Sequence, residues 1–272
     1  MSESEQQNIS RADAAGQDTR RLVQKNFGAV AAAYVTSKVH ASGADLDWLV
    51  EAAALTGTEH VLDVATGGGH TAFALAPYAA EVVALDLTRP MLEVAAKEAI
   101  ARGLNNIRYL EGDAQALPCE DASFDVVACR QAPHHFPKVD EAVREWARVL
   151  RPGGKLLLVD STSPEEVEAQ ALLHEIEVLR DPSHVRNHRI SEWTAFLRQA
   201  GFTVGTAREW SLYLDIPSWT QRMRTPPDAV ATIERLMRAA SPEVRERLHI
   251  KERDGELGFT LPVALILARK IV

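Results

Sequence analysis

A glycine-rich turn contains the residues best suited to bind a ligand. The apolar run at residues 61–66 leads into three consecutive glycines, Gly67 to Gly69, and an apolar helical pattern follows. This order is typical of a strand, a tight turn and a helix. Glycine allows positive φ and close approach to a ligand, and the first turn of a helix offers unpaired N–H groups. The turn therefore predicts a site for an anionic or polar ligand.

The acids around this turn narrow the choice of ligand. Residues 67–72 fit the pattern G-x-G-x-x-A, so an NAD(P)-dependent oxidoreductase is one alternative. Asp86, which ends the next apolar segment, suits a ribose diol in either kind of nucleotide site. Asp63 would repel a pyrophosphate, but it can accept hydrogen bonds from an ammonium group or order the turn. These charges favour a ligand that has a ribose and a cationic amine.

The flanking sequence predicts the elements that position the turn. Apolar strand segments are expected at residues 61–64, 82–85, 107–110, 124–128 and 155–159, with helical patterns between them at 70–79, 90–102 and 139–150. This alternation predicts an α/β fold with a mostly parallel sheet covered on both faces. Two later strands, 202–214 and 259–268, predict an antiparallel end to the sheet. Further helices are expected at 22–39, 45–54, 164–180, 191–200 and 218–249.

Composition limits the class of protein. The chain has 272 residues, 46% of them hydrophobic, and a formal net charge of -8, which predicts one large domain and argues against nucleic acid as a partner. No apolar stretch approaches the ~20 residues of a membrane span, and the start lacks the features of a signal peptide. Cys119 and Cys129 fit a reducing compartment and form no metal-ligand set. We expect a cytoplasmic protein without a metal, with a disordered tail over residues 1–20 and a folded domain over 21–272.

Several motifs taken together resemble class I S-adenosylmethionine-dependent methyltransferases. They are Asp63-x-Ala65-x-Gly67-x-Gly69, Asp86, Glu111-Gly-Asp113-Ala114, Phe124-Asp125 and Leu150-Arg-Pro-Gly-Gly-Lys155. The chain is most similar to the ubiquinone and menaquinone C-methyltransferase group. Within that group it resembles small bacterial members of unassigned function that have an R-x-x-x-H-H-F element, here 130–136, and an R-D-P-S-H-V-R element, here 180–186. The N-terminal helices lack the Asn and Arg-Trp signature of the quinone enzymes, which argues against a quinone acceptor.

The resemblance implies a cofactor, a topology and roles for individual residues. The cofactor would be S-adenosylmethionine, bound on a Rossmann-like seven-stranded sheet of order 3-2-1-4-5-7-6. Asp63 would order the turn, Asp86 would hold the ribose, and Arg130 would border the methionine end. The other residues implied to contact the cofactor are Ala65, Gly67 and Gly69 at the turn, Leu87, Met91 and Ala114 around the adenine, and Asp113 at its amino group. Tyr34, on the helical face at 22–39, is a further candidate because helices preceding such a turn often cover the ligand.

Two histidines are candidates for catalysis. Methyl transfer from a sulfonium is an in-line displacement on an activated carbon, so the protein mainly aligns the reactants and excludes water. A phenol, enol or protonated amine as acceptor would also need a base, and His134 and His135 follow the fourth strand. Adjacent residues on an extended segment point in opposite directions, so at most one faces the pocket. We favour His135.

The later helical segments predict a lid over the acceptor. Segments at about 21–54, 164–192 and 216–250 are assigned to it, with His184 and Arg186 as candidate acceptor contacts. The cations at 180–189 could select a small acceptor, or they could be ordinary solvated surface charge. His184 and His188 have i, i+4 spacing, which could hold a metal only if the segment were helical. The favoured function is methyl transfer to a small molecule; a cofactor-binding protein without catalysis remains an alternative.

Overall fold

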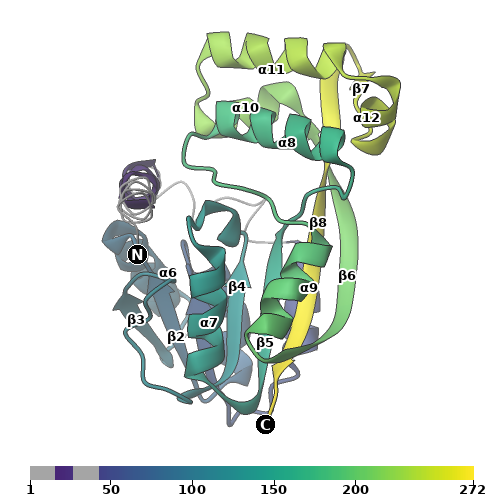
Figure 1. Cartoon of the computed structure of the whole chain (residues 1–272). Coiled ribbons are helices and arrows are strands. Elements are labelled where there is room, and N and C mark those ends of the chain that lie inside the picture. The colour runs from purple at the N-terminus through teal and green to yellow at the C-terminus, as the bar shows by residue number, and fades with distance from the viewer. Residues whose placement is uncertain (1–15, 27–42) are drawn as a thin grey trace, which may run out of the picture.

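The computed structural model describes residues 16–26 and 43–272, which form an α/β fold with a helical cap above the sheet (Figure 1). The sheet has the strand order β3-β2-β1-β4-β5-β8-β6, and β7 pairs with β8. Strands β1 to β5 run parallel, whereas β8 is antiparallel to both β5 and β6. The strands are β1 (His60–Val64), β2 (Glu81–Asp86), β3 (Ile107–Glu111), β4 (Phe124–Arg130), β5 (Leu150–Ser161), β6 (Phe202–Asp215), β7 (Lys251–Arg253) and β8 (Glu256–Lys270).

The expected topology is confirmed, with β8 as the seventh strand of the predicted order. The short strand β7 was not expected. Its three residues, Lys251, Glu252 and Arg253, are all exposed, so it has no apolar pattern that sequence reasoning could use. It forms only because the end of β8 offers it backbone partners.

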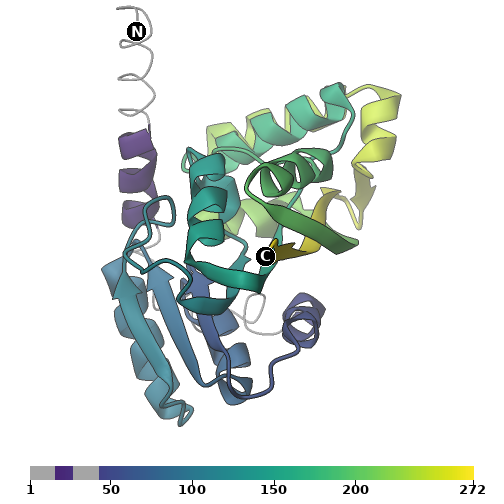
Figure 2. The same ribbon diagram turned by 60° about the horizontal axis from the view of Figure 1, so that its bottom comes forward.

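Helices cover both faces of the sheet (Figure 2): on one face α4 (Ala44–Ala53), α5 (His70–Leu75) and α6 (Arg89–Ala101), and on the other α7 (Val139–Val149) and α9 (Ile190–Gln199). Side chains alternate along β1, so that Val61 packs with α4 and α5, whereas Leu62 and Val64 pack with α7. Burial of both faces explains why the parallel strands read as continuous apolar runs. The carboxyl ends of β1 to β5 are therefore left to form a site.

We call the second layer the cap. It consists of α8 (Val167–Arg180), α10 (Ile216–Met223), α11 (Pro227–Ala239) and α12 (Pro242–Arg247), joined to the extended ends of β6 and β8. It has its own apolar core, in which the rings of Trp219 and Phe259 lie 5.0 Å apart. The helical region expected at 218–249 is divided because Pro227 and Pro242 each begin a new helix.

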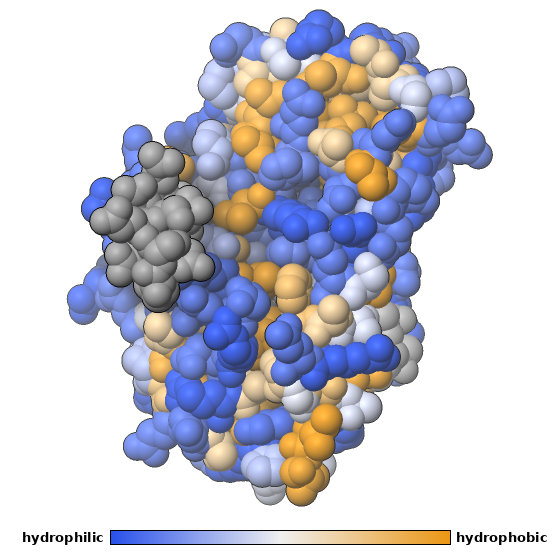
Figure 3. Space-filling view, viewed as in Figure 1, coloured by the Kyte–Doolittle hydropathy of each residue, from blue (hydrophilic) through white to orange (hydrophobic). Residues whose placement is uncertain are grey.

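Exposed apolar side chains lie on the outer face of the cap (Figure 3); on α8 they are Val167 and Val178. Within residues 16–26 and 43–272, no helix combines the length and apolarity needed to cross a membrane. The N-terminal region differs from expectation, because residues 16–20, assigned to a disordered tail, are part of a helix over 16–26. Tyr34 lies outside the described residues.

Candidate active site

The glycine turn connects β1 to α5 and has the backbone conformation that its glycines predict. Gly67 has φ 52° and Gly69 has φ 86°, both in the left-handed region. At Gly69 a side chain is also excluded by space, because a Cβ atom would lie 2.5 Å from the ring of Phe73 and 3.1 Å from the Cβ of Ala95. The turn is therefore close to the helices that flank it, and its backbone is exposed only toward the carboxyl ends of the strands.

Asp63 stabilises the conformation of the glycine turn. Its side chain is buried and accepts a hydrogen bond from the Thr66 hydroxyl at 2.5 Å. Burial raises the pKa of Asp63 to about 7, although the hydrogen bonds from Thr66 and the Ala72 backbone oppose the shift. Asp63 does not line the cavity above the turn. Of the two roles that the sequence left open for this carboxylate, the structure shows the ordering of the turn.

Asp86 forms part of the cavity wall. It accepts hydrogen bonds from the backbone N–H of Gly67 and of Thr88, each at 2.8 Å, and its side chain is buried. Burial raises the pKa of the Asp86 carboxyl, and the two N–H groups act in the opposite direction. The carboxylate thus joins the end of β2 to the glycine turn, where a ligand on the turn would meet it.

The cavity brings together most of the residues expected to bind the cofactor. Its wall includes Ala65, Gly67, Asp86, Leu87, Met91, Asp113, Ala114, Arg130 and His135. Gly69 shapes the turn from outside this wall. The wall also includes residues that sequence reasoning did not identify, among them Arg20, Val23, Thr66, His70, Thr71 and Gln115. Thr66 had a usable signal, since it directly precedes the first glycine and follows the strand acid by three residues.

The helix at 16–26 closes one side of the cavity. Arg20 forms an ion pair with Asp113 at 2.8 Å, and the Gln24 side chain donates to the Leu87 carbonyl at 3.0 Å. A helix over the ligand was expected at 22–39, but Arg20 and Val23 were not identified as residues of the cavity wall because this part of the sequence is mostly polar. The helix therefore covers the two segments assigned to the adenine.

Arg130 links the cavity to α4. Its guanidinium pairs with Asp45 at 2.7 Å, and both side chains are largely buried, with 7% and 13% of their surface exposed. The positive charge of Arg130 also opposes the rise in the pKa of Asp63. The end of β4 is thus held at the cavity wall by a contact from a helix 85 residues earlier in the chain.

The cavity chemistry fits S-adenosylmethionine better than a dinucleotide. Asp86 and Asp113 in the wall suit the hydroxyl groups and the amine of such a ligand, and the Asp86 carboxylate beside the glycine turn would repel a pyrophosphate. A family model described as "Methyltransferase domain" matches residues 62–158. The chain is also 38% identical over 242 residues to YcgJ of Bacillus subtilis, an uncharacterized methyltransferase, covering 88% of this chain and 96% of that protein. The chain belongs to the S-adenosylmethionine-dependent methyltransferases.

A solved structure and a further sequence relative agree with this membership. The crystal structure of the B. subtilis YcgJ protein superimposes with a TM-score of 0.81 at 37% identity, covering 84% of this chain and 99% of that one. A demethylmenaquinone methyltransferase of Thermus thermophilus is 39% identical over 144 residues, which are 51% of this chain and 65% of that protein. The enzyme is thus a methyltransferase with S-adenosylmethionine as its cofactor. The oxidoreductase and non-catalytic alternatives are set aside.

Two histidines lie at the other side of the methyltransferase cavity, on the short helix η2 (Pro133–His135) after β4. His135 lines the cavity, and His134 does not. The His134 ring lies 2.6 Å from Asp160 at the end of β5, and the same carboxylate accepts the His134 backbone N–H at 2.9 Å. Burial alone would lower the pKa of His134, but the Asp160 carboxylate outweighs it and raises that pKa.

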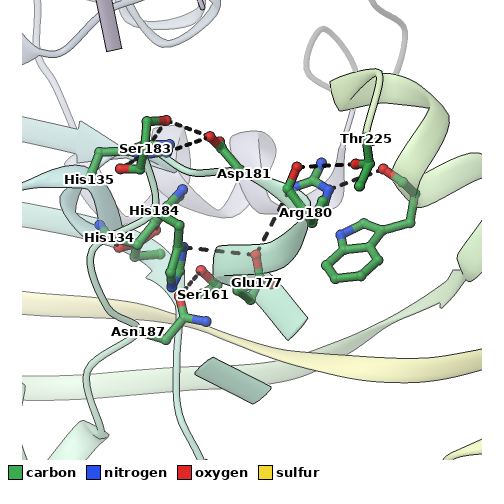
Figure 4. A network of polar contacts seen from close by, with 12 residues as sticks. His134, His135, Ser161, Glu177, Arg180, Asp181, Ser183, His184, Asn187 and Thr225 are labelled. Atoms are coloured by element: carbon green, nitrogen blue, oxygen red, sulfur yellow. Dashed lines mark hydrogen bonds and ion pairs between the residues drawn. The ribbon is translucent and has the colours of Figure 1, made fainter. Parts of the chain in front are cut away.

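His135 has the opposite electrostatic setting. Its Nδ1 lies 2.9 Å from the carbonyl oxygen of Ser183, in the segment that follows α8 (Figure 4). Burial, together with the neighbouring His134, lowers the pKa of His135 to about 4. His135 is therefore neutral at pH 7 and has one ring nitrogen able to accept a proton.

The structure does not bring His184 and His188 together. The segment that contains them is not helical; His184 stacks on His134 with ring centroids 5.6 Å apart, and His188 packs on Trp193 at 5.3 Å. The helical condition for a metal site at His184 and His188 is therefore not met. In the described part of the chain, no three His, Cys, Asp or Glu side chains are grouped as metal ligands.

The arginines of this segment also lie away from the cofactor cavity. Arg180 lies over the ring of Trp219 at 4.9 Å, and Arg186 and Arg189 both pair with Glu192. Arg186 lines a separate cavity beside α8, together with His174 and other residues. His184 and Arg186, the two candidate acceptor contacts, are thus not part of the wall that contains His135.

Proposed function

We propose that this methyltransferase transfers the methyl group to a small-molecule acceptor by in-line displacement, with the acceptor placed against His135. One observation supports this most strongly: a neutral imidazole lies in the wall of the same cavity as the glycine turn. The acceptor lies at the end of β4, on the opposite side of the cavity from Asp86 and Asp113. The lid over the acceptor is the chain that leaves the cap, since residues 183–186 hydrogen-bond to η2 beside His135.

S-adenosylmethionine supplies an activated methyl group on a sulfonium when bound. The protein contributes alignment, because the turn and Asp86 fix one reactant and the β4 end fixes the other. Alignment of this kind contributes on the order of 7 to 11 kcal/mol to lowering the barrier. Phe136, Pro137 and the helix at 16–26 line the cavity and exclude water from it.

His135 takes the proton from a phenol, enol or ammonium acceptor. Because the Ser183 carbonyl can only accept a hydrogen bond, the Nδ1 of His135 carries the hydrogen. The lone pair of the neutral ring is then on Nε2, on the side of the ring away from Ser183. General bases contribute roughly 10²- to 10⁴-fold to the rate, the most when their pKa lies near the working pH. The lowered pKa of His135 places its contribution at the low end of this range.

The test begins with a search for the acceptor. The enzyme is incubated with methyl-labelled S-adenosylmethionine and fractionated small-molecule extracts, and label in a product is measured. A labelled small-molecule product is expected, and label confined to macromolecules would contradict the proposal.

The identified acceptor then tests the base. We expect His135→Gln to lower kcat by roughly 10²-fold, the low end of the effect of a general base, because the pKa of His135 is lowered to about 4. S-adenosylhomocysteine should bind as in the wild type, as measured by isothermal titration. Unaltered turnover by this variant would remove His135 from the mechanism and leave the methyl transfer itself standing.

A further inference from the structure

Two sequence elements that lie far apart in the chain are in contact at the active site. The segment 180–186 packs against η2, and the backbone N–H groups of Val185 and Arg186 both donate to the His134 carbonyl, at 2.8 and 3.1 Å. The Ser183 carbonyl lies 2.9 Å from Nδ1 of His135, 48 residues earlier in the chain. The loop that carries the proposed base is therefore held by the segment that enters from the cap.

Asp181 fixes the conformation of this segment. Its Oδ1 accepts hydrogen bonds from the backbone N–H of Ser183 at 2.9 Å and from the Ser183 hydroxyl at 2.6 Å. Its carbonyl accepts the N–H of His184 at 2.9 Å. Asp181 and Ser183 have only 3% and 0% of their surface exposed, so water does not compete for these bonds. A tight turn results, with the Ser183 carbonyl directed at His135 (Figure 4).

This contact decides which nitrogen of His135 carries the hydrogen. A neutral imidazole in water favours the form with the hydrogen on Nε2, whereas a carbonyl next to Nδ1 selects the other tautomer. Ser183 has only acceptors to offer at that side, since its hydroxyl hydrogen is directed to Asp181; its Oγ lies 3.4 Å from the same Nδ1. Among the described residues, the ionisable groups that act on His135 include His134, which is paired with Asp160, as well as His184 and Asp181 itself.

We propose that Asp181 and Ser183 are positioning residues that hold His135 as the Nδ1–H tautomer, so that Nε2 is the nitrogen that accepts the proton of the methyl acceptor. The tautomer itself follows from the hydrogen bonds among His135, Ser183 and Asp181. Its use in catalysis rests on the proposed function of His135.

The test reads the tautomer directly by NMR of the full chain labelled with ¹⁵N-histidine, without cofactor or acceptor. The His135 signals are assigned by their loss in His135→Gln. In the wild type we expect a protonated Nδ1 and an unprotonated Nε2. Asp181→Ala should shift His135 toward the Nε2–H form, whereas Asp181→Asn keeps an oxygen at the same place and should restore the wild-type tautomer.

Two further variants keep the test decisive. Ser183→Ala removes only the hydroxyl that joins the turn to Asp181, so it should give a mixture of tautomers even if Asp181→Ala does not fold. Asp215→Ala is the matched control, because Asp215 accepts a similar bond from the Ser218 N–H at 2.8 Å within the cap and belongs to no contact with His135. This control should leave the His135 signals unchanged.

Activity gives a second readout once an acceptor is known. Asp181→Ala should lower kcat by roughly 10- to 100-fold, with the affinity for S-adenosylhomocysteine within about twofold of the wild type. A wild-type His135 protonated on Nε2, or wild-type tautomers in both Asp181→Ala and Ser183→Ala, would overturn the positioning role. Neither result would affect the proposed methyl transfer, which the labelling experiment tests separately.

Discussion

The two sides of the active-site cavity are built in different ways. The centre of the cofactor side comes from neighbouring parts of the chain, because Asp86 accepts the Gly67 N–H only 19 residues away. The helix at 16–26 then covers this centre from a distant part of the sequence. The acceptor side combines three distant segments: His134 meets Asp160, 26 residues later, and His135 meets Ser183, 48 residues later. The first side consists of backbone and carboxylates, and the second consists of imidazoles held by carboxylates and a carbonyl.

The family model covers the centre of the cofactor side and η2, but it does not cover the partners of the two histidines. The methyltransferase family model spans residues 62–158, which include the glycine turn, Asp86 and η2. Asp160, Asp181 and Ser183 lie beyond its end. The shared part can therefore provide the cofactor site, while the contacts that set the charge and tautomer of the histidines come from outside it.

The largest effect should come from Gly69, where the cofactor side has no room for a side chain. In Gly69→Ala the new Cβ would lie 2.5 Å from the ring of Phe73, and the alanine backbone would have to keep φ 86°. We therefore expect a loss of roughly 2 to 5 kcal/mol in unfolding free energy. Gly57→Ala is the control, because Gly57 has φ 96° and no atom within 4 Å of its Cβ position. Urea unfolding of both variants measures the difference. Equal losses would mean that backbone strain alone acts at Gly69.

Asp86→Ala should weaken binding on the cofactor side of the cavity and so distinguish it from the acceptor side. Removal of the carboxylate leaves the bonds to a ribose unmade, which costs about 1.5 to 3 kcal/mol, or roughly 10- to 100-fold in the dissociation constant for S-adenosylhomocysteine. His135→Gln, on the acceptor side, should leave that constant unchanged. Isothermal titration compares the two variants, and an equal loss in both would show that the two sides are not independent.

Asp63 should make the stability of the cofactor side depend on pH. Its pKa is raised from an ordinary value near 4 to about 7, so the folded state holds a proton that the unfolded state has lost. The stabilisation of the folded state by this proton is fully present below about pH 4 and is lost as the pH rises to about 7. Relative to Asp63→Asn, the wild type should lose about 1.4 kcal/mol between pH 5 and 6. Urea unfolding at both pH values tests this, and parallel curves would contradict it.

The smallest effect is expected for Arg186→Ala. The Arg186 guanidinium pairs with Glu192 at a partly exposed site, so its loss should cost less than about 1 kcal/mol in unfolding free energy. Because Arg186 lies away from the cofactor cavity, we expect unchanged affinity for S-adenosylhomocysteine and an unchanged KM for the acceptor. Arg189→Ala, which removes another partner of Glu192, is the matched control. A raised acceptor KM in Arg186→Ala alone would extend the acceptor site to the cavity beside α8.

The sequence predicted the fold well wherever a local pattern determines the structure. The seven main strands were expected because apolar strands that end in an acid or a glycine turn can be read locally, and their order was implied by the family resemblance. Most of the residues expected to contact the cofactor line one cavity. The same reasoning missed Arg20 and Val23, since a mostly polar helix that covers a cavity has no pattern of its own. The i, i+4 spacing of His184 and His188 would be meaningful only in a helix, and the segment is not helical.

The sequence by itself determined the strand, turn and helix around Gly67 to Gly69 and the acids at the strand ends. These depend on backbone conformation over a few residues, and glycine and aspartate impose them locally. The tertiary structure alone decided that His135 rather than His134 lines the cavity, and that it is neutral with Nδ1 against Ser183. Charge and tautomer depend on burial and on partners from distant segments, which only the folded chain brings together.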